Sequence, residues 1–189
     1  MNRIIVIQFT TLDGVVEDPD GSAGAPFGGW AFRYGPEAVA GDKFKLGPRL
    51  DTCGLLLGRT TWQLFANIWP NQTDKFSTQM NKAPKFVASR TLADVSAWSN
   101  STVLQGELTT EVDKLRRDRD VVVIGSTSVV HALMQDELVD EYRLLMFPAV
   151  LGSGQRLFQT PAGADNLRLV SVEQSGAAAL LGYERAATN

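Results

Sequence analysis

The chain has 189 residues, of which 44% are apolar and 21% are charged, and its formal net charge is -3. This length and composition fit one soluble domain, expected over residues 1–189, and they exclude a disordered chain. A mildly acidic chain without a block of lysine and arginine also argues against sequence-independent binding of nucleic acid.

Cysteine and histidine each occur once, as Cys53 and His131. No disulfide within the chain is therefore available, and Cys53, beside an apolar run, is expected to be a buried and inert thiol. A zinc site built from His and Cys clusters is out of reach, so no metal is expected. No signal peptide and no run near the ~20 residues of a membrane span is visible, so we expect a cytoplasmic protein without a membrane partner.

The first half of the chain alternates strands with helices. Residues 3–9 (RIIVIQF) are a β-branched apolar run typical of a buried strand. Residues 17–30 are rich in Gly, Pro and Asp and predict a long loop, either functional or a surface excursion. The sequence then predicts, in chain order, a helix near 37–46, a strand over 53–58 and a helix over 61–69 ended by Pro70.

The second half continues this alternation and then becomes rich in strands. The predicted elements are a strand over 85–89, a helix over 109–119 opened by Thr110, a strand over 121–125, a helix over 127–136, a strand over 140–150 that bends or lies at an edge near Pro148, and a hairpin of 167–174 with 178–186 around Ser175 and Gly176. The pattern predicts a three-layer α/β fold. Its central sheet is mostly parallel with helices on both faces, and an antiparallel C-terminal hairpin closes it.

The stretch GLLLGRTTW combines a glycine, a cation and hydroxyls at the end of a buried strand. Gly58 permits a sharp turn, and Thr60 is a candidate N-cap for the helix that follows. Arg59 adds a planar charged fork suited to phosphate, beside a helix N-terminus that favours anions. Taken alone, the stretch fits equally well a surface ion pair of Arg59 and a simple cap by Thr60.

Two further strands end in the same way. KFVASRTL places Ser89 and Arg90 after a strand, and VVVIGSTS places Gly125, Ser126 and Thr127 after another. In a parallel α/β sheet the carboxyl ends of the strands share one edge, where ligands bind. The three junctions together predict a groove for a ligand with two separated phosphate groups. Neither a Walker loop nor a GxGxxG turn is present, which disfavours a kinase or a Rossmann dehydrogenase.

These motifs carry a resemblance to a known family. LLLGRTTW resembles the Gly-Arg-x-Thr-Trp segment of dihydrofolate reductases, and VVVIGSTSVV resembles their glycine turn. The chain is more similar to stand-alone relatives of the reductase domain of bacterial riboflavin biosynthesis, which share LDG, GRTTW, LVDEYRL and LGSGQRLF in this order. The resemblance covers nearly the whole chain. It implies a dihydrofolate reductase-like, NADPH-binding fold and hydride transfer of the 5-amino-6-(5-phosphoribosylamino)uracil reductase type.

The resemblance also assigns roles to individual residues. It implies that Gly58, Arg59 and Thr60 lie at the adenosine end of the cofactor and that Ser89 and Arg90 recognise the 2′-phosphate. Likewise, Gly125, Ser126 and Thr127 would take the pyrophosphate, and Phe9, Thr11 and Val16 would flank the nicotinamide. One departure is that dihydrofolate reductases carry a second glycine where this chain has Ser126, which is expected to weaken or shift the phosphate contact.

The substrate side is less defined. Dihydrofolate reductases hold the pterin with one carboxylate on the first helix, for which Glu37 and Asp42 are candidates, although both also fit solvated helix charges. Asp13 is a third acid, with a turn before Gly14 as its alternative role. The aromatic residues near the loop could stack on a flat heterocycle or pack the loop down; they are Trp30, Phe32 and Tyr34.

Two functions remain open at this point. The first is an NADPH-dependent reductase of a pterin-like or ribosylaminopyrimidine-like substrate, and the second is a non-catalytic or sensory NADP(H)-binding module on the same fold. Hydrolysis by a Ser–His–Asp triad is disfavoured, because His131 falls inside a helix and no GxSxG elbow occurs. A homodimer is expected as well, since the antiparallel tail offers an apolar strand that needs cover.

Overall fold

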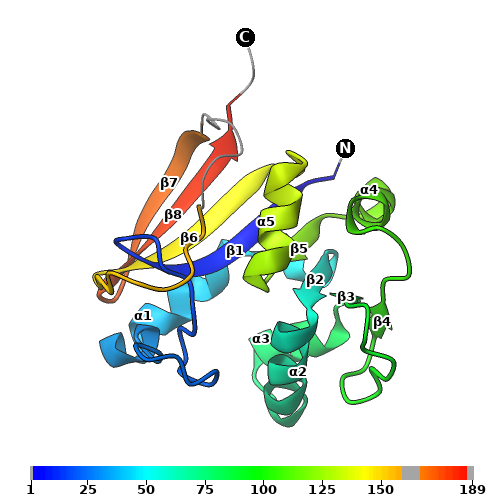
Figure 1. Cartoon of the computed structure of the whole chain (residues 1–189), viewed down its shortest axis with the longest axis horizontal. Coiled ribbons are helices and arrows are strands. Elements are labelled where there is room, and N and C mark those ends of the chain that lie inside the picture. The colour runs from blue at the N-terminus through cyan, green and yellow to red at the C-terminus, as the bar shows by residue number, and fades with distance from the viewer. Residues whose placement is uncertain (1, 159–166, 187–189) are drawn as a thin grey trace. The chain divides into compact units, whose positions relative to one another are not determined.

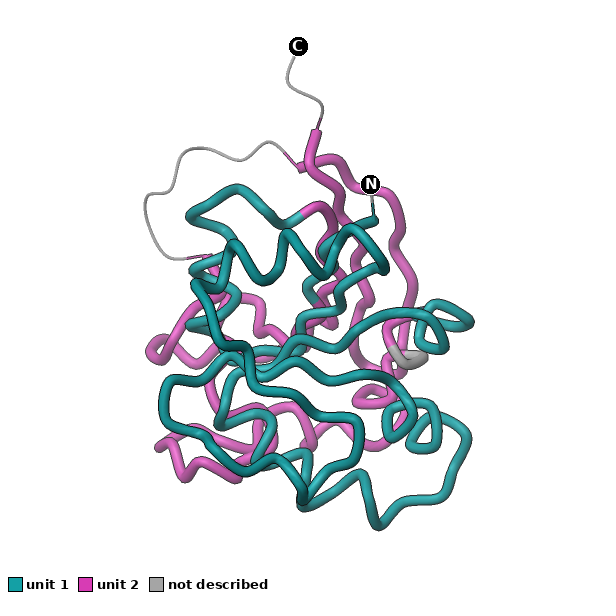
Figure 2. Tube along the Cα trace, turned by 90° about the vertical axis from the view of Figure 1, so that its right-hand side faces the viewer, with its two compact units in different colours: residues 1–6, 46–139 teal, residues 7–45, 140–189 magenta. Residues whose placement is uncertain are grey.

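The computed structural model describes residues 2–158 and 167–186, and its chain divides into two compact units (Figure 2). Unit 1 consists of Met1–Val6 and Leu46–Val139, and unit 2 consists of Ile7–Lys45 and Asp140–Asn189. Each unit is therefore built from two separate stretches of sequence. Within the described ranges, no helix is both long and apolar enough to cross a membrane.

An eight-stranded mixed sheet runs through the chain with the strand order β4-β3-β2-β5-β1-β6-β8-β7 (Figure 1). The strands are β1 (Ile4–Thr11), β2 (Gly54–Gly58), β3 (Lys85–Ala88), β4 (Ser101–Val103), β5 (Val121–Val123), β6 (Glu141–Phe147), β7 (Leu167–Ser175) and β8 (Ala178–Arg185). The described residues also form five α-helices: α1 (Gly35–Ala40), α2 (Arg59–Ile68), α3 (Lys75–Lys82), α4 (Leu108–Asp118) and α5 (Thr127–Gln135). The predicted α/β fold, mostly parallel with an antiparallel C-terminal pair, is confirmed.

Unit 1 is built on parallel pairing of strands that are buried on both faces. Leu55 of β2 pairs with Lys85 of β3 and with Val122 of β5, and Ile5 of β1 pairs with Val122 from the other side. Continuous leucine and valine runs form these strands because neither face of them meets water. Helices α2 and α5 pack against β2, and α4 packs against β5.

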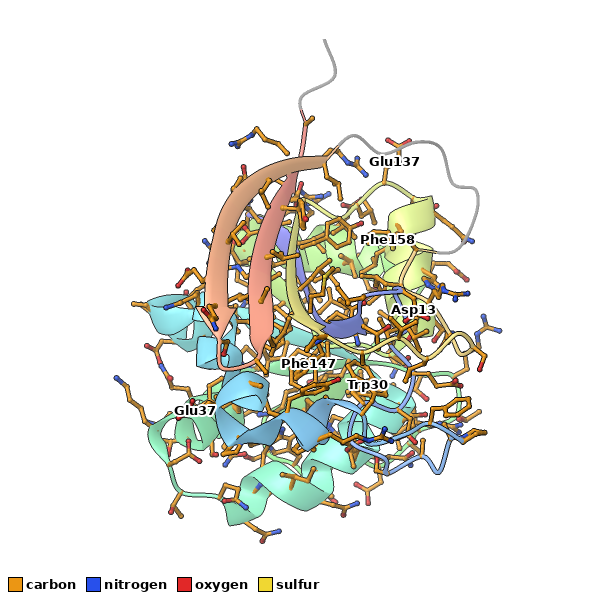
Figure 3. The ribbon with its side chains drawn as sticks, turned by 90° about the vertical axis from the view of Figure 1, so that its left-hand side faces the viewer. Asp13, Trp30, Glu37, Glu137, Phe147 and Phe158 are labelled. Atoms are coloured by element: carbon orange, nitrogen blue, oxygen red, sulfur yellow. The ribbon has the colours of Figure 1, made fainter. Side chains whose placement is uncertain are left out.

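Unit 2 carries the antiparallel strands and an aromatic core. β8 pairs with β6 on one side and with β7 on the other. Trp30, which has no exposed surface, packs edge-on against Phe147 of β6 with ring centroids 5.6 Å apart (Figure 3). The predicted hairpin around Ser175 and Gly176 is confirmed, with Gly176 at a φ of 55° that suits glycine.

Several predicted boundaries were wrong. The helix expected near 37–46 ends at Ala40, because Gly41 takes a left-handed conformation (φ 48°), and a 3-10 turn over Gly41–Lys45 follows. The helix expected to open at Thr110 begins at Leu108, after Glu107 in extended backbone. Helix α3 and the three-residue strand β4 had no counterpart in the sequence prediction. The strand expected over 140–150 ends at Phe147, directly before Pro148.

The long loop predicted over 17–30 is organised by one buried acid. The carboxylate of Asp18 accepts hydrogen bonds from the backbone N–H groups of Ala23 and Ala25, both at 2.9 Å. Its backbone carbonyl accepts from Gly21 at 3.2 Å and from Gly29 at 2.9 Å. Because Asp18 is only 8% exposed, these bonds satisfy a carboxylate that burial would otherwise penalise. The loop is therefore a built structure without regular secondary structure.

Candidate functional site

The β2–α2 junction in unit 1 differs from the prediction at its cap. The helix begins at Arg59, and its N-cap is Gly58 in extended backbone, so the assignment of Thr60 as N-cap was wrong. Thr60 lies exposed in the first turn. No side chain caps this helix, because glycine has none to offer. The first turn therefore begins two residues earlier than predicted, and Arg59 directly follows the strand end.

Gly58 meets the turn that follows β5. Its backbone N–H donates to the carbonyl of Gly125 at 3.0 Å. A Cβ built on Gly58 would collide with the hydroxyl oxygen of Ser126, which fills the space that the missing side chain leaves. The Ser126 hydroxyl also lies 3.0 Å from that of Ser128. Ser126, which stands where dihydrofolate reductases carry a second glycine, is thus accommodated by Gly58 on the neighbouring strand.

The turn after β5 leaves backbone donors available. Gly125 has a φ of 78°, and a Cβ there would stand 3.4 Å from the Thr61 hydroxyl and 4.0 Å from the Thr127 nitrogen. Ser126 is the N-cap of α5, yet its side chain makes no capping bond. The N–H groups of Thr127 and Ser128 have no acceptor among the residues that the structure describes. Free N–H groups beside a glycine fit an anionic group such as a phosphate.

Arg59 is held by the segment that follows β3. Its Nη1 donates to the Thr91 hydroxyl at 2.8 Å. The Ser89 hydroxyl accepts from the N–H groups of Thr91 at 3.2 Å and Leu92 at 3.0 Å, and so shapes this turn. Arg90 is exposed. Two of the three predicted strand ends are thereby joined by a direct hydrogen bond between Arg59 and Thr91.

The residues predicted beside the nicotinamide lie in unit 2. Phe9 stacks on Phe44 at 5.6 Å and meets Phe147 edge-on at 5.4 Å. Thr11 has no exposed surface, and Val16 is 3% exposed. The Thr11 hydroxyl donates to Asp13 at 2.6 Å and accepts from the Val15 N–H at 2.9 Å. These contacts give all three residues a packing role, and their place beside a nicotinamide stays a prediction.

Asp13 holds a turn together. Its carboxylate accepts hydrogen bonds from the Thr11 hydroxyl, from the Gly152 N–H at 2.8 Å and from the Leu151 N–H at 3.3 Å. Arg156 adds an ion pair at 3.6 Å. Led by the Thr11 hydrogen bond, these donors lower the pKa of Asp13 to about 2. The alternative reading of Asp13 as a turn residue is therefore the one its contacts favour (Figure 3).

The other substrate-side candidates do not converge in unit 2. Glu37 is exposed in the first turn of α1, which has only six residues, and nothing is described of the Asp42 side chain. Of the three aromatic residues, Trp30 and Tyr34 pack the loop. The Trp30 indole donates to the Glu17 carbonyl at 2.8 Å, and the Tyr34 hydroxyl donates to Pro148 at 2.9 Å. Phe32 is 56% exposed, whereas Trp30 is fully buried.

A small pocket lies under the long loop within unit 2. Its volume is about 180 Å³, and its lining is mostly apolar: Val15, Glu17, Ala25, Pro26, Phe27, Leu151, Ser153 and Gly154. Sites that enclose a drug-sized molecule usually measure several hundred Å³. This pocket is therefore too small to enclose a dinucleotide.

Three hydroxyl residues of the same motifs complete the unit 1 cluster through contacts that the sequence alone did not predict. Thr61 stands beside Gly125, Thr91 holds Arg59, and Ser128 pairs with Ser126. The motifs already contained these residues, since each is a hydroxyl residue within three positions of a predicted site residue. The sequence motifs do not show which strands pair, and strand pairing determines which of these hydroxyl groups lie close to one another.

Comparison with known proteins identifies the family of this chain. The model of the RibD C-terminal domain family matches residues 2–181, and the chain belongs to this family. Membership, together with the fold, indicates a reductase-type function.

Matches to relatives and to solved structures cover most of the chain. The chain is 27% identical over 176 residues to the Bacillus subtilis (strain 168) protein YyaP, covering 89% of this chain and 87% of the relative. It is similar in structure to a Shewanella sp. PV-4 protein named for riboflavin biosynthesis (TM-score 0.76, 20% identity, 98% and 99% covered). It also resembles a pyrimidine reductase-like protein from Corynebacterium diphtheriae (TM-score 0.71, 13% identity, 99% and 93% covered). At these identities the structural matches establish the fold.

Proposed function

We propose that this chain is an NADPH-dependent reductase that transfers a hydride to a flat, pterin-like or ribosylaminopyrimidine-like heterocycle. The observation that carries the proposal is the cluster at the strand ends of unit 1. There, Arg59 is fixed by Thr91 while the N–H groups of α5 stay available beside Gly125. A cluster of this kind fits a ligand with separated phosphate groups, and family membership supports a nicotinamide dinucleotide as that ligand.

In this proposal, backbone N–H groups bind the pyrophosphate of the cofactor. The N–H groups of Thr127 and Ser128 would hold phosphate oxygens at the N-terminus of α5, where the helix dipole favours negative charge. Gly125 keeps the approach open, since a Cβ there would enter the space between Thr61 and the Thr127 nitrogen. Ser126 leaves this approach clear because its side chain turns toward Gly58 and Ser128.

The choice of a phosphorylated cofactor rests on the two arginines. Arg59 uses Nη1 for Thr91 and keeps the remaining donors of its guanidinium for a phosphate. Arg90 follows Ser89 and is exposed, which suits a second contact to a dianion. We propose that these two side chains favour the 2′-phosphate of NADPH over the hydroxyl of NADH.

When it is bound, NADPH supplies the hydride, so the protein's own task is to bind, orient and exclude water. Two of the three acids singled out by the sequence, Asp13 and Glu37, are not suited to deliver a proton. Asp13 is committed to its turn with a pKa of about 2, and Glu37 is solvated at the start of a short helix. This observation favours a second candidate function, a module on the same fold that binds NADP(H) without turnover.

A turnover assay separates the two candidates. The full chain with saturating NADPH is supplied with pterins, folates and ribosylaminopyrimidines, and loss of nicotinamide absorbance is followed. The reductase proposal expects substrate-dependent oxidation with at least one ring class and none without substrate. Binding of NADPH without oxidation by any of these compounds would instead establish the non-catalytic module.

A further inference from the structure

The small pocket under the long loop of unit 2 combines an apolar lining with one carboxylate. Its volume is about 180 Å³, and its polar side chains are those of Glu17 and Ser153. Glu17 is the one charged residue in the lining. The apolar side chains are those of Val15, Ala25, Pro26, Phe27 and Leu151. A ligand that fits this pocket therefore needs a small apolar body and a group that a carboxylate can bind.

Two of the three segments that form the pocket walls are bonded to each other. The Val16 N–H donates to the Gln155 carbonyl at 2.8 Å, and the Gly152 N–H donates to the Asp13 carboxylate at 2.8 Å. The segment after β1 and the segment after β6 therefore run side by side (Figure 1). These bonds fix the distance between the two walls.

The third wall, residues 25–27, belongs to the ordered loop. The buried carboxylate of Asp18 accepts a hydrogen bond from the Ala25 N–H at 2.9 Å and so fixes the start of this wall. The Glu17 carbonyl accepts from the indole of the buried Trp30 at 2.8 Å, which fixes the backbone that carries the Glu17 side chain. The pocket is thus built before a ligand arrives, which lowers the entropy that binding costs.

Glu17 differs from the other acids of residues 13–30. Asp13 binds the turn after β6, Asp18 binds the backbone of its own loop, and Asp20 binds the Ser22 hydroxyl at 2.8 Å. The Glu17 carboxylate makes no hydrogen bond or ion pair with any residue that the structure describes. No lysine or arginine lines the pocket either. The pocket therefore carries a negative charge that the described residues leave unpaired.

Gly154 leaves room for this carboxylate on the opposite wall. Its φ of 121° lies in the region that favours glycine. A Cβ built on Gly154 would lie 2.9 Å from Cγ1 of Val15 and 3.1 Å from Oε2 of Glu17. Any other residue at this position would displace the valine or the carboxylate. Glycine therefore keeps the Glu17 carboxylate beside the apolar lining.

We propose that this pocket binds a small organic ammonium ion, with its apolar body among the apolar side chains and its ammonium group beside the Glu17 carboxylate. The Phe27 ring lines the pocket and is 50% exposed, and an aromatic ring face attracts a cation. Anions are disfavoured, because the one charge in the lining is negative. The site is separate from the phosphate contacts proposed in unit 1, so it is compatible with both candidate functions of the chain.

Titration of the full chain with benzylammonium, the cation of benzylamine at neutral pH, tests this site. In spectra of the isotope-labelled protein, the amide signals of Ala25, Phe27 and Gly154 should shift and saturate. We expect a dissociation constant of about 0.1–1 mM, the range for a ligand of this size. Benzyl alcohol has nearly the same shape without the charge and should bind about fivefold to tenfold more weakly, the effect of losing one partly solvated charged contact.

Variants of exposed side chains assign the contacts without unfolding the protein. Glu17→Gln should raise the dissociation constant for benzylammonium about fivefold to tenfold and leave that for benzyl alcohol unchanged, because only the charge is lost. Phe27→Ala should weaken the binding of both compounds, since it removes part of the lining. Asp20→Asn is the matched control, because it removes one negative charge from the same loop but lies outside the lining, and it should keep the wild-type constant.

Three results would overturn the proposal. The first is the absence of saturable shifts up to about 10 mM benzylammonium. The second is equal affinity of the wild type for benzylammonium and benzyl alcohol. The third is a Glu17→Gln variant that binds benzylammonium as tightly as the wild type or no more weakly than Asp20→Asn does.

Discussion

Arg59 is the side chain on which the choice of cofactor depends most directly. It leaves the end of β2, is exposed, and is oriented by the Thr91 hydroxyl at 2.8 Å. This contact restricts the side chain before any ligand arrives, which lowers the entropy that binding a phosphate would cost. The arginine could be recognised from GRTTW, whereas its hydrogen bond to Thr91 could be recognised only once β2 and β3 were paired.

Replacing Arg59 should therefore separate the two nicotinamide cofactors. We expect Arg59→Ala to raise the dissociation constant for NADPH roughly tenfold to a hundredfold, the loss typical of hydrogen bonds to a charged group. The constant for NADH should change little. Titration by nicotinamide fluorescence measures both, with Arg33→Ala, an exposed arginine of unit 2, as the control. Equal changes for both cofactors would contradict recognition of the 2′-phosphate by Arg59.

Gly58 is required because Ser126 occupies the space above it. Gly58→Ala should lower the free energy of unfolding by about 1–3 kcal/mol, the usual cost of overpacking. Ser126→Gly in the same chain removes the hydroxyl and should restore most of that loss. Urea denaturation of the two single variants and the double variant measures the coupling between the two sites. Strictly additive losses would show that the two residues do not share the space.

Asp13 makes the free energy of unfolding depend on pH. Because its pKa in the folded state is lowered to about 2, the carboxylate stabilises the fold above the pKa of the unfolded chain. That contribution is lost as the pH falls from about 4 to about 2. Asp13→Asn should lack the contribution, so its unfolding free energy and that of the wild type should converge at low pH. A constant difference from pH 2 to pH 7 would contradict this account.

At the scale of elements, the loop over residues 17–30 depends on Asp18. Its carboxylate binds Ala23 and Ala25, and its carbonyl binds Gly21 and Gly29. Composition predicted a loop here, but it could not reveal an ordered one, because the order comes from one acid reaching five and seven residues ahead. Glycine content alone would also fit a disordered segment.

Removing that acid should loosen the loop without unfolding the sheet. We expect Asp18→Ala to speed amide exchange and limited proteolysis within residues 17–30 and to lower the free energy of unfolding by about 1–3 kcal/mol. Asp20→Ala is the control, because Asp20 binds only the exposed Ser22. If both variants are cut at the wild-type rate, the order of the loop does not come from Asp18.

The strands were predicted better than the helices, for physical reasons. Leucine and valine runs such as 55–57 and 121–123 admit few alternatives to a buried strand. Helix α3 is short and polar, and its best signal was the N-cap Asp74, which binds the N–H groups of Phe76 and Ser77. Strand β4 has three residues and exists because it pairs with β3, so its own sequence carries almost no signal.

At the scale of the whole molecule, the family match covers residues 2–181 and carries the reductase-type function. The predicted phosphate-end residues all lie in unit 1, where Arg59 bonds to Thr91 and Gly58 bonds to Gly125, and their role toward a cofactor stays a prediction. The candidate acids Glu37 and Asp42 were inferred from the resemblance to dihydrofolate reductases, and the third candidate, Asp13, proved to be committed to its turn. Because each unit is made of two separate stretches of sequence, tests of function need the full chain.

Binding of NADPH is the claim that both candidate functions share. Titration of the full chain with NADPH and with NADH, followed by nicotinamide fluorescence and checked by calorimetry, tests it most directly. The account predicts saturable binding of NADPH in the micromolar range, at least about tenfold tighter than that of NADH, which corresponds to about 1.4 kcal/mol. Failure of both cofactors to bind at millimolar concentration would contradict it.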